Sequence, residues 1–507
     1  MKGRALFSLY DTSRAVEFAE QLIKSDWEII GSDETVKVLK ANNIPVSNIT
    51  DFINTKENFG FPPTLHPKIE LALTDDCKNR IDLVYILTYP LSEGIDVGGH
   101  TILALAAKGG RIPITNNNDM ELAVKEIVKK GTISKSLCSE YIYKANYVNA
   151  KHYASVIKNQ DNHEILFGNK SYNLLTGENP YQVPASAFIS EHSDSLSLFS
   201  LKKVSGEEPC FTNMADADCI LQTLCFSAEA FNLNIGKIPY ICIAAKHGNA
   251  CGMGVSFESA ESAIEIALWG NPRSIWGGEL ITNFLVDKKL AEILLQSSKR
   301  EKIFNSAFWM LDLIIAPSFS NDAINILGKR KRRKLFENSA LTKPFIKVIN
   351  NSFRMVRGGF LRQPSASYIL NLKECSNVNL NNFDKDKIVS TIIAWVVAFT
   401  SNHGGNEVAI AKNNNLLGVG GGPSTLEAAN VAIKRALECS HNCTNAVFAA
   451  DAFFPFDDAP KALVEAGCNA GIVPGGGKMF NDIKKYFSDN NVQCVFIPEK
   501  YRGFCRH

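Results

Sequence analysis

Residues 241–252 read Ile-Cys-Ile-Ala-Ala-Lys-His-Gly-Asn-Ala-Cys-Gly. The short apolar run that follows Pro239 predicts a buried strand. The strand ends at Lys246 and His247 and is followed by a turn of small residues. A lysine beside an imidazole at the end of a buried strand is suited to proton transfer near neutral pH. The alternative interpretation is a strand end that carries two solvated polar residues, so the rest of the chain has to decide.

The composition is that of an ordinary globular protein. With 507 residues, of which 45% are apolar and 21% charged, the chain is long enough for two or more domains with sizeable cores. The formal net charge of +2 gives no electrostatic reason to expect a nucleic-acid or membrane partner. The N-terminus predicts a first strand rather than a signal peptide, and no apolar run reaches membrane-spanning length. Thirteen cysteines without paired spacing predict free thiols and a cytoplasmic location.

Two local clusters suggest other ligands. The stretch Cys439-Ser-His-Asn-Cys443 lacks nearby residues that would complete a four-ligand site, so we expect a helix end with two thiols and no metal. Residues 329–334, the one strong run of positive charge, follow an amphipathic stretch. They predict a solvated helix end, with a nucleic-acid patch as the alternative.

The first 130 residues alternate short apolar runs with helical periodicity, which predicts an α/β domain. The predicted strands cover residues 5–10, 28–30, 83–87 and 112–115. The predicted helices cover residues 13–23, 34–42, 99–108 and 118–129. Helical spacing over 137–157 predicts a connector, and the break at 161–163 places a domain boundary near residue 165.

Three motifs in this region are distinctive: Phe61-Pro-Pro-Thr-Leu-His-Pro67, Asp82-Leu-Val-Tyr-Ile-Leu-Thr-Tyr-Pro90 and Ile95-Asp-Val-Gly-Gly-His-Thr-Ile-Leu-Ala-Leu-Ala-Ala-Lys108. They resemble the cyclohydrolase half of the bifunctional AICAR transformylase/IMP cyclohydrolase family. The resemblance implies a methylglyoxal-synthase-like nucleotide domain over residues 1–165. The positions that match the family's cyclohydrolase motifs are Thr64, His66, Tyr89, Asp96, Gly98, Gly99 and Lys108.

Other positions in this region depart from the family pattern. Residues 61–64 lack the family's Arg and Lys, and Asp33 and Glu34 replace two glycines of a Ser-Thr-Gly-Gly-Thr loop. A nucleotide phosphate needs cations and close backbone approach, whereas these replacements add negative charge and side-chain bulk. We therefore expect a degenerate domain that is retained for structure and no longer closes the ring to IMP. Surviving cyclohydrolase activity is the alternative.

A second series of motifs follows in collinear order. They are Gly177-Glu-Asn-Pro-Tyr-Gln182, Lys246–Gly252, Asn271–Gly278, Asp312–Pro317, Arg354–Gln363, Asn406–Asn413, Asp451–Phe456 and Tyr501–His507. They resemble the transformylase half of the same family, in which the second motif reads Lys-His-Ala-Asn-Pro-Cys-Gly. The resemblance implies a transformylase domain over residues 166–507, built from two cytidine-deaminase-like units and working as a homodimer.

The resemblance implies a formyltransferase of purine biosynthesis, which moves a formyl group from 10-formyltetrahydrofolate to the amine of AICAR or of an AICAR-like acceptor. His247 is the expected proton carrier, Lys246 would tune it or stabilise an oxyanion, and Asn406 would orient the intermediate. The expected substrate contacts are Asn179, Gly277, Asp312 and Arg502. The expected folate contacts are Asp451, Phe453, Phe454, Pro455 and Phe456, for which a core aromatic cluster is the alternative.

The phosphate-binding residues of this half also differ from the family. Leu175 and Thr176 stand where the family has an Arg and a Tyr that help to hold the ribonucleotide, and Leu426 replaces another Arg. Loss of a guanidinium removes a bidentate phosphate contact, so an altered acceptor is expected. One alternative is the ordinary bifunctional enzyme, a transferase and hydrolase in one chain, and another is a non-catalytic homologue that binds nucleotide or folate. The intact Lys246-His247 pair favours chemistry, without a metal or a nucleic-acid partner.

Overall fold

The computed structural model describes residues 3–55, 62–157, 163–190, 194–346, 351–376 and 383–505. The chain divides into two compact units, Met1–Phe167 and Gly168–His507, and both are mixed α/β as the sequence predicts. A few residues of the predicted motifs and of the predicted break lie outside the described residues: Phe61, Asp161, Asn162, Arg506 and His507.

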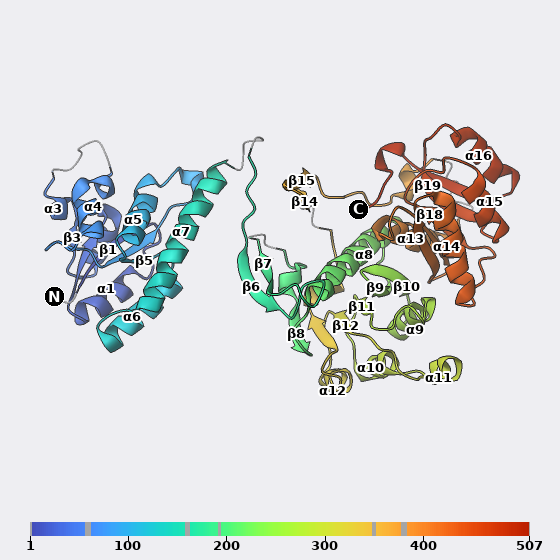
Figure 1. Ribbon diagram of the computed structural model, residues 1–507, viewed down its shortest axis with the longest axis horizontal. Helices are drawn as coiled ribbons and strands as arrows, with labels where there is room; N and C mark the ends of the chain where they lie inside the picture. Colours follow the sequence, from blue (N-terminus) through green and yellow to red (C-terminus); the bar gives the residue numbers. More distant parts are fainter. Residues whose placement is uncertain are drawn as a thin grey trace. The chain divides into compact units, whose positions relative to one another are not determined.

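The first unit is built on a five-stranded parallel sheet in the order β3-β2-β1-β4-β5 (Figure 1). Its strands are β1 (Gly3–Leu9), β2 (Trp27–Gly31), β3 (Ser47–Asn48), β4 (Leu83–Leu87) and β5 (Ile112–Ile114). Most strand residues are buried because helices cover both faces. The strand order reverses between β1 and β4, and the carboxyl ends of such a pair are where open parallel sheets bind ligands.

Two apolar cores fix the helices of this unit. One face is covered by α1 (Ala15–Lys24), α2 (Asp33–Ala41) and α6 (Asn117–Lys130), and the other by α3 (Ile49–Ile53), α4 (Pro67–Thr74) and α5 (Val97–Lys108). The expected connector is α7 (Lys135–Ile157), which contributes Tyr141 to one core and Ala145 to the other. The Tyr141 hydroxyl donates to the Asp119 carbonyl at 3.1 Å, so this helix is an integral part of the first unit.

The second unit is built on an eleven-stranded mixed sheet in the order β20-β19-β18-β16-β17-β10-β9-β11-β12-β13-β8. The strands up to β13 are β8 (Lys202–Ser205), β9 (Tyr240–Lys246), β10 (Asn249–Ser256), β11 (Glu279–Thr282), β12 (Leu313–Ala316) and β13 (Lys334–Glu337). The later strands are β16 (Asn406–Lys412), β17 (Asn415–Gly422), β18 (Val447–Ala450), β19 (Ala470–Pro474) and β20 (Gln493–Ile497).

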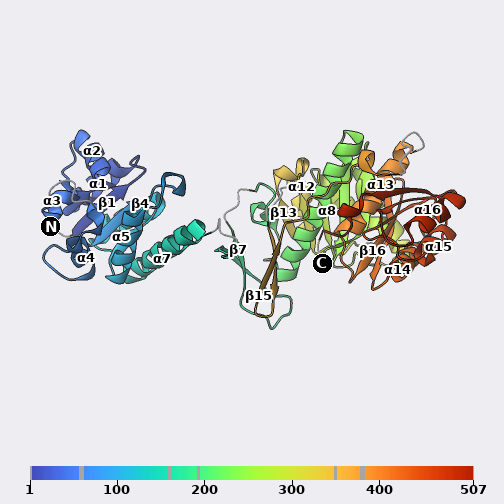
Figure 2. The ribbon, with the colours of Figure 1, turned by 90° about the horizontal axis from the view of Figure 1, so that it is seen from above.

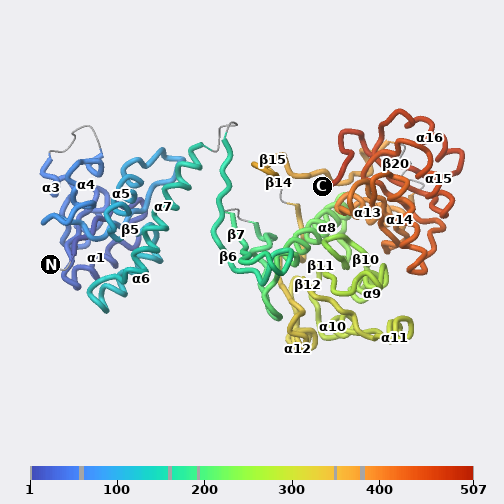
Figure 3. Tube along the Cα trace, in the orientation of Figure 1, coloured from blue at the N-terminus to red at the C-terminus, as the bar shows by residue number. Residues whose placement is uncertain are grey.

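The large sheet contains one arrangement twice. The order β10-β9-β11-β12-β13 is repeated as β17-β16-β18-β19-β20, and in each set the first two pairings are antiparallel and the last two parallel. An antiparallel pairing of β10 with β17 joins the sets. We call residues 211–337 the first half and residues 385–497 the second half; Figures 1 and 3 show them in green to yellow and in orange to red.

The sheet is the middle of three layers, with helices packed on both of its faces. One face packs on α8 (Phe211–Ile235) and α13 (Lys385–Thr400), which form a single core with strands of both halves (Figure 2). Thr223 on α8 donates to Thr400 on α13 at 2.9 Å. The opposite face carries a separate set of helices in each half. These are α9 (Ala260–Gly270), α10 (Lys288–Leu295) and α12 (Asn321–Leu327), and then α14 (Thr425–Glu438), α15 (Asp458–Glu465) and α16 (Phe480–Asp489).

Two small ribbons and a short helix complete the second unit. The ribbons pair β6 (Asn169–Leu174) with β7 (Ala185–Ile189) and β14 (Ser352–Val356) with β15 (Gly359–Gln363). The short helix is α11 (Ser298–Phe304). Among the described residues, no helix combines the length and apolar character needed to cross a membrane.

The basic run at 329–334 differs from the prediction of a solvated helix end. Arg333 is 2% exposed, and its guanidinium donates to the carbonyls of Leu311, Leu327 and Trp309. Lys334 is buried as well. The end of the basic run therefore has a structural role, because the Arg333 guanidinium has enough donors to satisfy several backbone carbonyls at once.

Candidate functional site

The Lys-His pair lies on the tight hairpin between β9 and β10. Lys246 pairs with Asn249, and the two residues between them, His247 and Gly248, both have positive φ, +52° and +68°. This is the twist that a two-residue hairpin favours. A Cβ at Gly248 would lie 2.8 Å from the Cys219 Cβ, so the turn requires glycine there. His247 is exposed at the tip, and its ring makes no hydrogen bond with any described residue.

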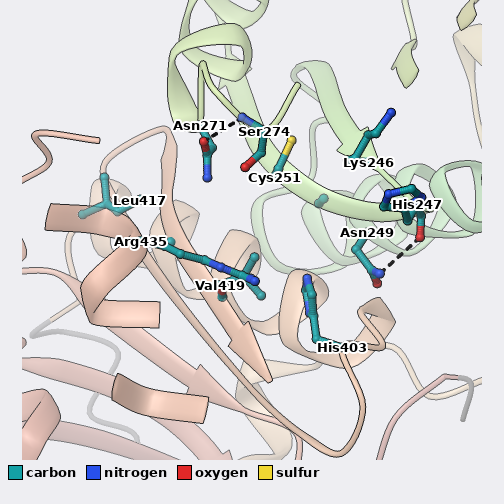
Figure 4. A pocket seen from close by; sticks show the side chains of 12 residues that line it. Lys246, His247, Asn249, Cys251, Asn271, Ser274, His403, Leu417, Val419 and Arg435 are labelled. Atoms are coloured by element: carbon teal, nitrogen blue, oxygen red, sulfur yellow. Dashed lines mark hydrogen bonds between the residues drawn. The ribbon is translucent and has the colours of Figure 1, made fainter. Parts of the chain in front are cut away.

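The ammonium of Lys246 is directed towards the loop before β11. Its Nζ donates to the Gly277 carbonyl, and Figure 4 shows this side chain directed away from Arg435. A Cβ at Gly277 would lie 3.2 Å from this Nζ and 3.7 Å from Asp312 Oδ2. The structure thus brings together Lys246, Gly277 and Asp312, which the sequence analysis assigned to the catalytic centre and the substrate site.

A buried carboxyl that the sequence analysis missed adjoins this lysine. Glu279 begins β11, is 3% exposed and pairs with Ala245 on β9. Its Oε2 has no hydrogen-bond partner among the described residues. Burial, together with the neighbouring Asp216, raises the pKa of Glu279 well above its usual range, although the charge of Lys246 opposes the shift. A neutral acid therefore stands beside the cation.

A cavity of about 230 Å³ lies at the seam between the two halves (Figure 4). The residues that line it include Asn249, Cys251, Asn271 and Ser274 from the first half and His403 and Arg435 from the second. Burial raises the pKa of Cys251 to about 12, so this thiol stays protonated and is not a nucleophile at neutral pH. The other polar groups that line the cavity are two imidazoles, an ammonium, a guanidinium, a hydroxyl and two side-chain amides.

A line of hydrogen bonds runs from the hairpin into the second half. Asn249 accepts from the Asn402 backbone N–H at 2.7 Å and donates to the Asn402 carbonyl at 3.2 Å. The next residue, His403, places its Nδ1 2.7 Å from Glu407 Oε2, and its backbone N–H donates to Glu407 Oε1. The Glu407 backbone N–H in turn donates to Asp451 Oδ1 at 2.9 Å. The hairpin at Asn249 and the motif at Asp451, about 200 residues apart in sequence, are therefore connected through the loop that carries Asn402 and His403.

Asp451 anchors the aromatic motif at the end of this line. It is 4% exposed, its Oδ2 has no partner among the described residues, and burial raises its pKa to about 7. The Gly503 backbone N–H donates to the Asp451 carbonyl at 2.9 Å. The Arg502 guanidinium lies 5.5 Å from the Phe453 ring centre. Predicted substrate and folate contacts thus adjoin each other here.

The members of the aromatic motif have different environments. Phe454 is 2% exposed and packs in the apolar core beside Phe448, with ring centres 6.2 Å apart. Pro455 and Phe456 are exposed, and Phe453 is half-buried. Only the outward residues can contact a ligand without rearrangement of the core, whereas Phe454 occupies the core position that was the alternative interpretation.

Two predicted site residues lie apart from the hairpin. Asn406 begins β16 and donates to the carbonyls of Gly422 and Pro423 at 3.4 and 3.2 Å. Asn402, four residues earlier in the chain, is the asparagine that bonds to the hairpin. Asn179 lies in an exposed loop between β6 and β7, where its side chain donates to Gln182 Oε1 at 2.9 Å.

The predicted cyclohydrolase residues do not form one cluster. Thr64 packs against Gly98, where a Cβ would lie 2.4 Å from its Oγ1. Asp96 caps α5 by accepting from the Gly99 N–H at 2.7 Å, and Tyr89 donates to the Ile95 carbonyl at 2.9 Å. His66 caps α4, accepting from the Lys68 N–H at 3.1 Å. Lys108 ends α5, roughly 18 Å along the helix axis from Asp96, and forms a 4.0 Å ion pair with Glu70.

Several further observations concern residues outside the motifs. The thirteen cysteines, all of which are described, form no disulfide. His441 Nε2 lies 2.8 Å from the Gly270 carbonyl and so links the two halves. The most prominent residues that the sequence analysis missed are Glu279, His403 and Glu407. The spacing His403-Gly-Gly-Asn-Glu407 was a usable signal for the last two, whereas Glu279 had none.

Comparison with known proteins gives consistent results. The family model described as AICARFT/IMPCHase bienzyme matches residues 111–435. The "Bifunctional purine biosynthesis protein PurH" of Fusobacterium nucleatum is 30% identical, with 99% of this chain and 100% of that protein covered. The protein of the same name from Anoxybacillus flavithermus is 29% identical, with 99% of each chain covered. A solved structure, "Crystal structure of ForH", is 22% identical over 31% of this chain and 97% of that chain, but its TM-score of 0.28 is too low to bear on the fold.

Proposed function

The chain belongs to the AICARFT/IMPCHase bienzyme family, and we propose that it transfers a formyl group from 10-formyltetrahydrofolate to the amine of AICAR or of an AICAR-like acceptor. The observation that carries the proposal is the line of contacts from Asn249 through Asn402, His403 and Glu407 to Asp451. It connects the Lys-His hairpin to the aromatic motif, the two features that would serve the acceptor and the folate.

The hairpin supplies the groups that formyl transfer requires. The acceptor amine must lose a proton as its nitrogen attacks the formyl carbon, and the folate N10 must gain a proton as it leaves. His247 is exposed at the turn and free to carry protons. Lys246 would stabilise the negative charge that develops on the formyl oxygen as the amine attacks the formyl carbon. Because burial raises the pKa of Glu279, this neighbouring acid does not neutralise the lysine.

The far end of the line has the character expected of a folate site. A folate ring is flat and aromatic with a hydrogen-bonding edge, so it fits a ring beside a carboxyl group. Phe453 offers a half-buried ring, and Asp451 offers an oxygen that no described group satisfies. Arg502, adjacent to Phe453, would hold an anionic part of either substrate.

The first unit lacks several features of a phosphate site, which supports a structural role. Asp33 and Glu34 occupy the first turn of α2, directly after β2. Helix N-termini attract anions, but carboxylates at that position repel a phosphate. Asp11 follows β1, where the strand order reverses between β1 and β4. A backbone and a side-chain hydrogen bond from Ser13 lower the pKa of Asp11 and keep it ionised. We infer that residues 1–165 form a degenerate methylglyoxal-synthase-like domain.

The repeated arrangement of the second unit supports a transformylase domain over residues 166–507 made of two cytidine-deaminase-like units. The β14–β15 ribbon exposes Met355 and Leu361 at 72% and 59%, and the β6–β7 ribbon exposes Phe188 at 57%. Exposed apolar ribbons of this kind favour association, in keeping with a homodimer. We expect this homodimer to be cytoplasmic, as purine biosynthesis is.

One assay tests the proposal and separates it from the alternatives. Purified protein is incubated with 10-formyltetrahydrofolate and AICAR, and the products are followed by absorbance and mass spectrometry. Formyl-AICAR without IMP is the expected result. IMP would identify the ordinary bifunctional enzyme and contradict the degenerate first domain. Binding of either substrate without transfer to AICAR or to a panel of related amines would identify a non-catalytic homologue and overturn the proposal.

A further inference from the structure

We propose that His403, held in place by Glu407, takes the proton from the attacking amine, as a second proton carrier of the formyl transfer. The inference rests on the proposed function and adds a residue pair that is not part of the predicted site. His403 lines the cavity beside the Lys-His hairpin, and Figure 4 shows its ring directed into the space between Asn249 and Arg435.

The histidine and the carboxylate form an oriented pair. The side chain of Glu407 is 1% exposed and that of His403 is 19% exposed. Nδ1 of His403 lies 2.7 Å from Glu407 Oε2, so the carboxylate favours the tautomer with a proton on Nδ1. Nε2, which bonds to no described residue, is then a proton acceptor at the cavity wall. A histidine oriented in this way by a buried carboxylate is the arrangement used by general bases.

The surrounding chain leaves room for the pair. Gly421 lies opposite Glu407 on β17. A Cβ at Gly421 would lie 2.4 Å from Glu407 Oε1 and 2.6 Å from the His403 Cβ. The glycine therefore provides the space that the carboxylate and the imidazole occupy, a role that the glycine-rich stretch of β17 did not reveal in sequence.

Comparison of the two halves indicates that the fold does not need this carboxylate. Lys246 ends β9 and Lys412 ends β16, and counting back from them places Ile241 where the second half has Glu407. Ile241 is fully buried in the shared core. Burial of a carboxylate in place of an aliphatic side chain is costly unless its partners compensate. The cost is explained if Glu407 serves chemistry through His403.

The proposed step balances. The acceptor nitrogen forms a bond to the formyl carbon, the bond between that carbon and N10 breaks, the amine proton moves to His403 Nε2, and N10 takes a proton. His247, which belongs to the hairpin turn and lines the same cavity, would supply that second proton. With two histidines, proton removal and proton delivery need not wait for a single group to turn over.

The test compares wild-type protein with His403→Gln, Glu407→Gln and a control, His163→Gln, which alters an exposed histidine of the first unit that does not line the cavity. Formyl transfer is measured over a range of acceptor concentrations. We expect His403→Gln to lower kcat by about 100-fold or more and Glu407→Gln by about 10-fold, each with little change in KM. The control should retain the wild-type kcat.

A second readout follows the ring itself. Nitrogen-15 NMR of histidine-labelled protein should show His403 protonated on Nδ1, and Glu407→Gln should shift its ring nitrogens while circular dichroism stays native. If the wild type is active and His403→Gln has an unchanged kcat, the role of His403 is overturned but the proposed function is not. A wild type that transfers no formyl group to any acceptor would overturn the proposed function and this role with it. Ring nitrogens that ignore Glu407→Gln would overturn the oriented pair.

Discussion

The two halves of the second unit share a framework but differ in the groups they place on it. In each half the strand that ends in a lysine exchanges the same pair of hydrogen bonds with the residue that follows the third strand. Asn283 Oδ1 accepts from the Ile241 N–H at 2.8 Å, and Asp451 Oδ1 accepts from the Glu407 N–H at 2.9 Å. The backbone N–H groups of Asn283 and Asp451 return bonds of 3.3 and 3.2 Å. Strand pairing and apolar packing thus reproduce the framework without fixing its polar residues.

The hairpin turns show the same contrast. His247 and Asn413 both have positive φ, +52° and +54°, at the first turn position of their hairpins. Asparagine, aspartate and histidine are the residues other than glycine that are enriched in this conformation, so either side chain is compatible with the turn. The first half therefore carries an imidazole at a position where the second half shows that an amide suffices for the turn. We take this as a sign that the imidazole is retained for chemistry.

The largest expected effect comes from exchanging these turn residues. His247→Asn copies the residue of the second half, so the turn should persist while the proton carrier is lost. We expect kcat for formyl transfer to fall by about 100-fold or more, a typical loss for a general acid–base group. Steady-state kinetics with AICAR as acceptor would measure it.

The reciprocal change provides the matched control. Asn413→His adds an imidazole at the equivalent turn, which is not part of the cavity lining. Formyl transfer should remain near the wild-type rate. If His247→Asn also remained near that rate, the proton-carrier role would be wrong, and the difference between the two turns would have no catalytic meaning.

An intermediate effect is expected from placing an acid at the first-half position that is equivalent to Asp451. Asn283 is 9% exposed, and its side chain donates to the Pro239 carbonyl at 2.9 Å. Asn283→Asp removes this donor and sets a carboxylate against a carbonyl oxygen. We expect the free energy of unfolding at pH 8 to fall by about 3 kcal/mol, as for an uncompensated buried charge. Urea denaturation would measure the change, and an unchanged midpoint would show that the loop can admit a charge.

Local patterns in the sequence predicted much of the framework. The apolar run before Lys246 corresponds to β9, and the runs at 83–87 and 112–115 correspond to β4 and β5. β3 was missed because two residues, Ser47 and Asn48, carry no periodic signal. The repeat of the large sheet was not predicted, because strand order arises from long-range pairing that no local pattern contains.

The candidate site was harder to predict than the fold. Lys246, Gly277 and Asp312 belong to separate motifs, yet the structure brings them together. Glu279 sits in the strand Glu-Leu-Ile-Thr, where a terminal acid normally indicates exposure, but its pairing with β9 buries it. Burial of this kind depends on which strands become neighbours, and no local pattern contains that information.

The smallest expected effect concerns Asp451, whose counterpart in the first half is an amide. Burial raises the pKa of this carboxyl from 3.8 to about 7, so between about pH 4 and 7 the folded chain keeps a proton that the unfolded chain releases. Stability from this group therefore falls as pH rises through that window, and the loss is complete above pH 7. Asp451→Asn keeps an oxygen for the Glu407 N–H and removes the buried charge.

We expect Asp451→Asn to raise the free energy of unfolding at pH 8 by roughly 1–2 kcal/mol, well below the full value of the pKa shift because the amide nitrogen that replaces the unpartnered oxygen stays buried. The gain should shrink as pH is lowered and vanish near pH 4, where the wild-type carboxyl is protonated in both states. Denaturation curves at pH 8, 6 and 4 would measure it. A gain that is the same at all three values would show that Asp451 is not the titrating group. A lower free energy of unfolding at pH 8 would show that the charge of Asp451 is compensated in the folded chain. The difference between Asp451 and Asn283 would then serve stability rather than binding.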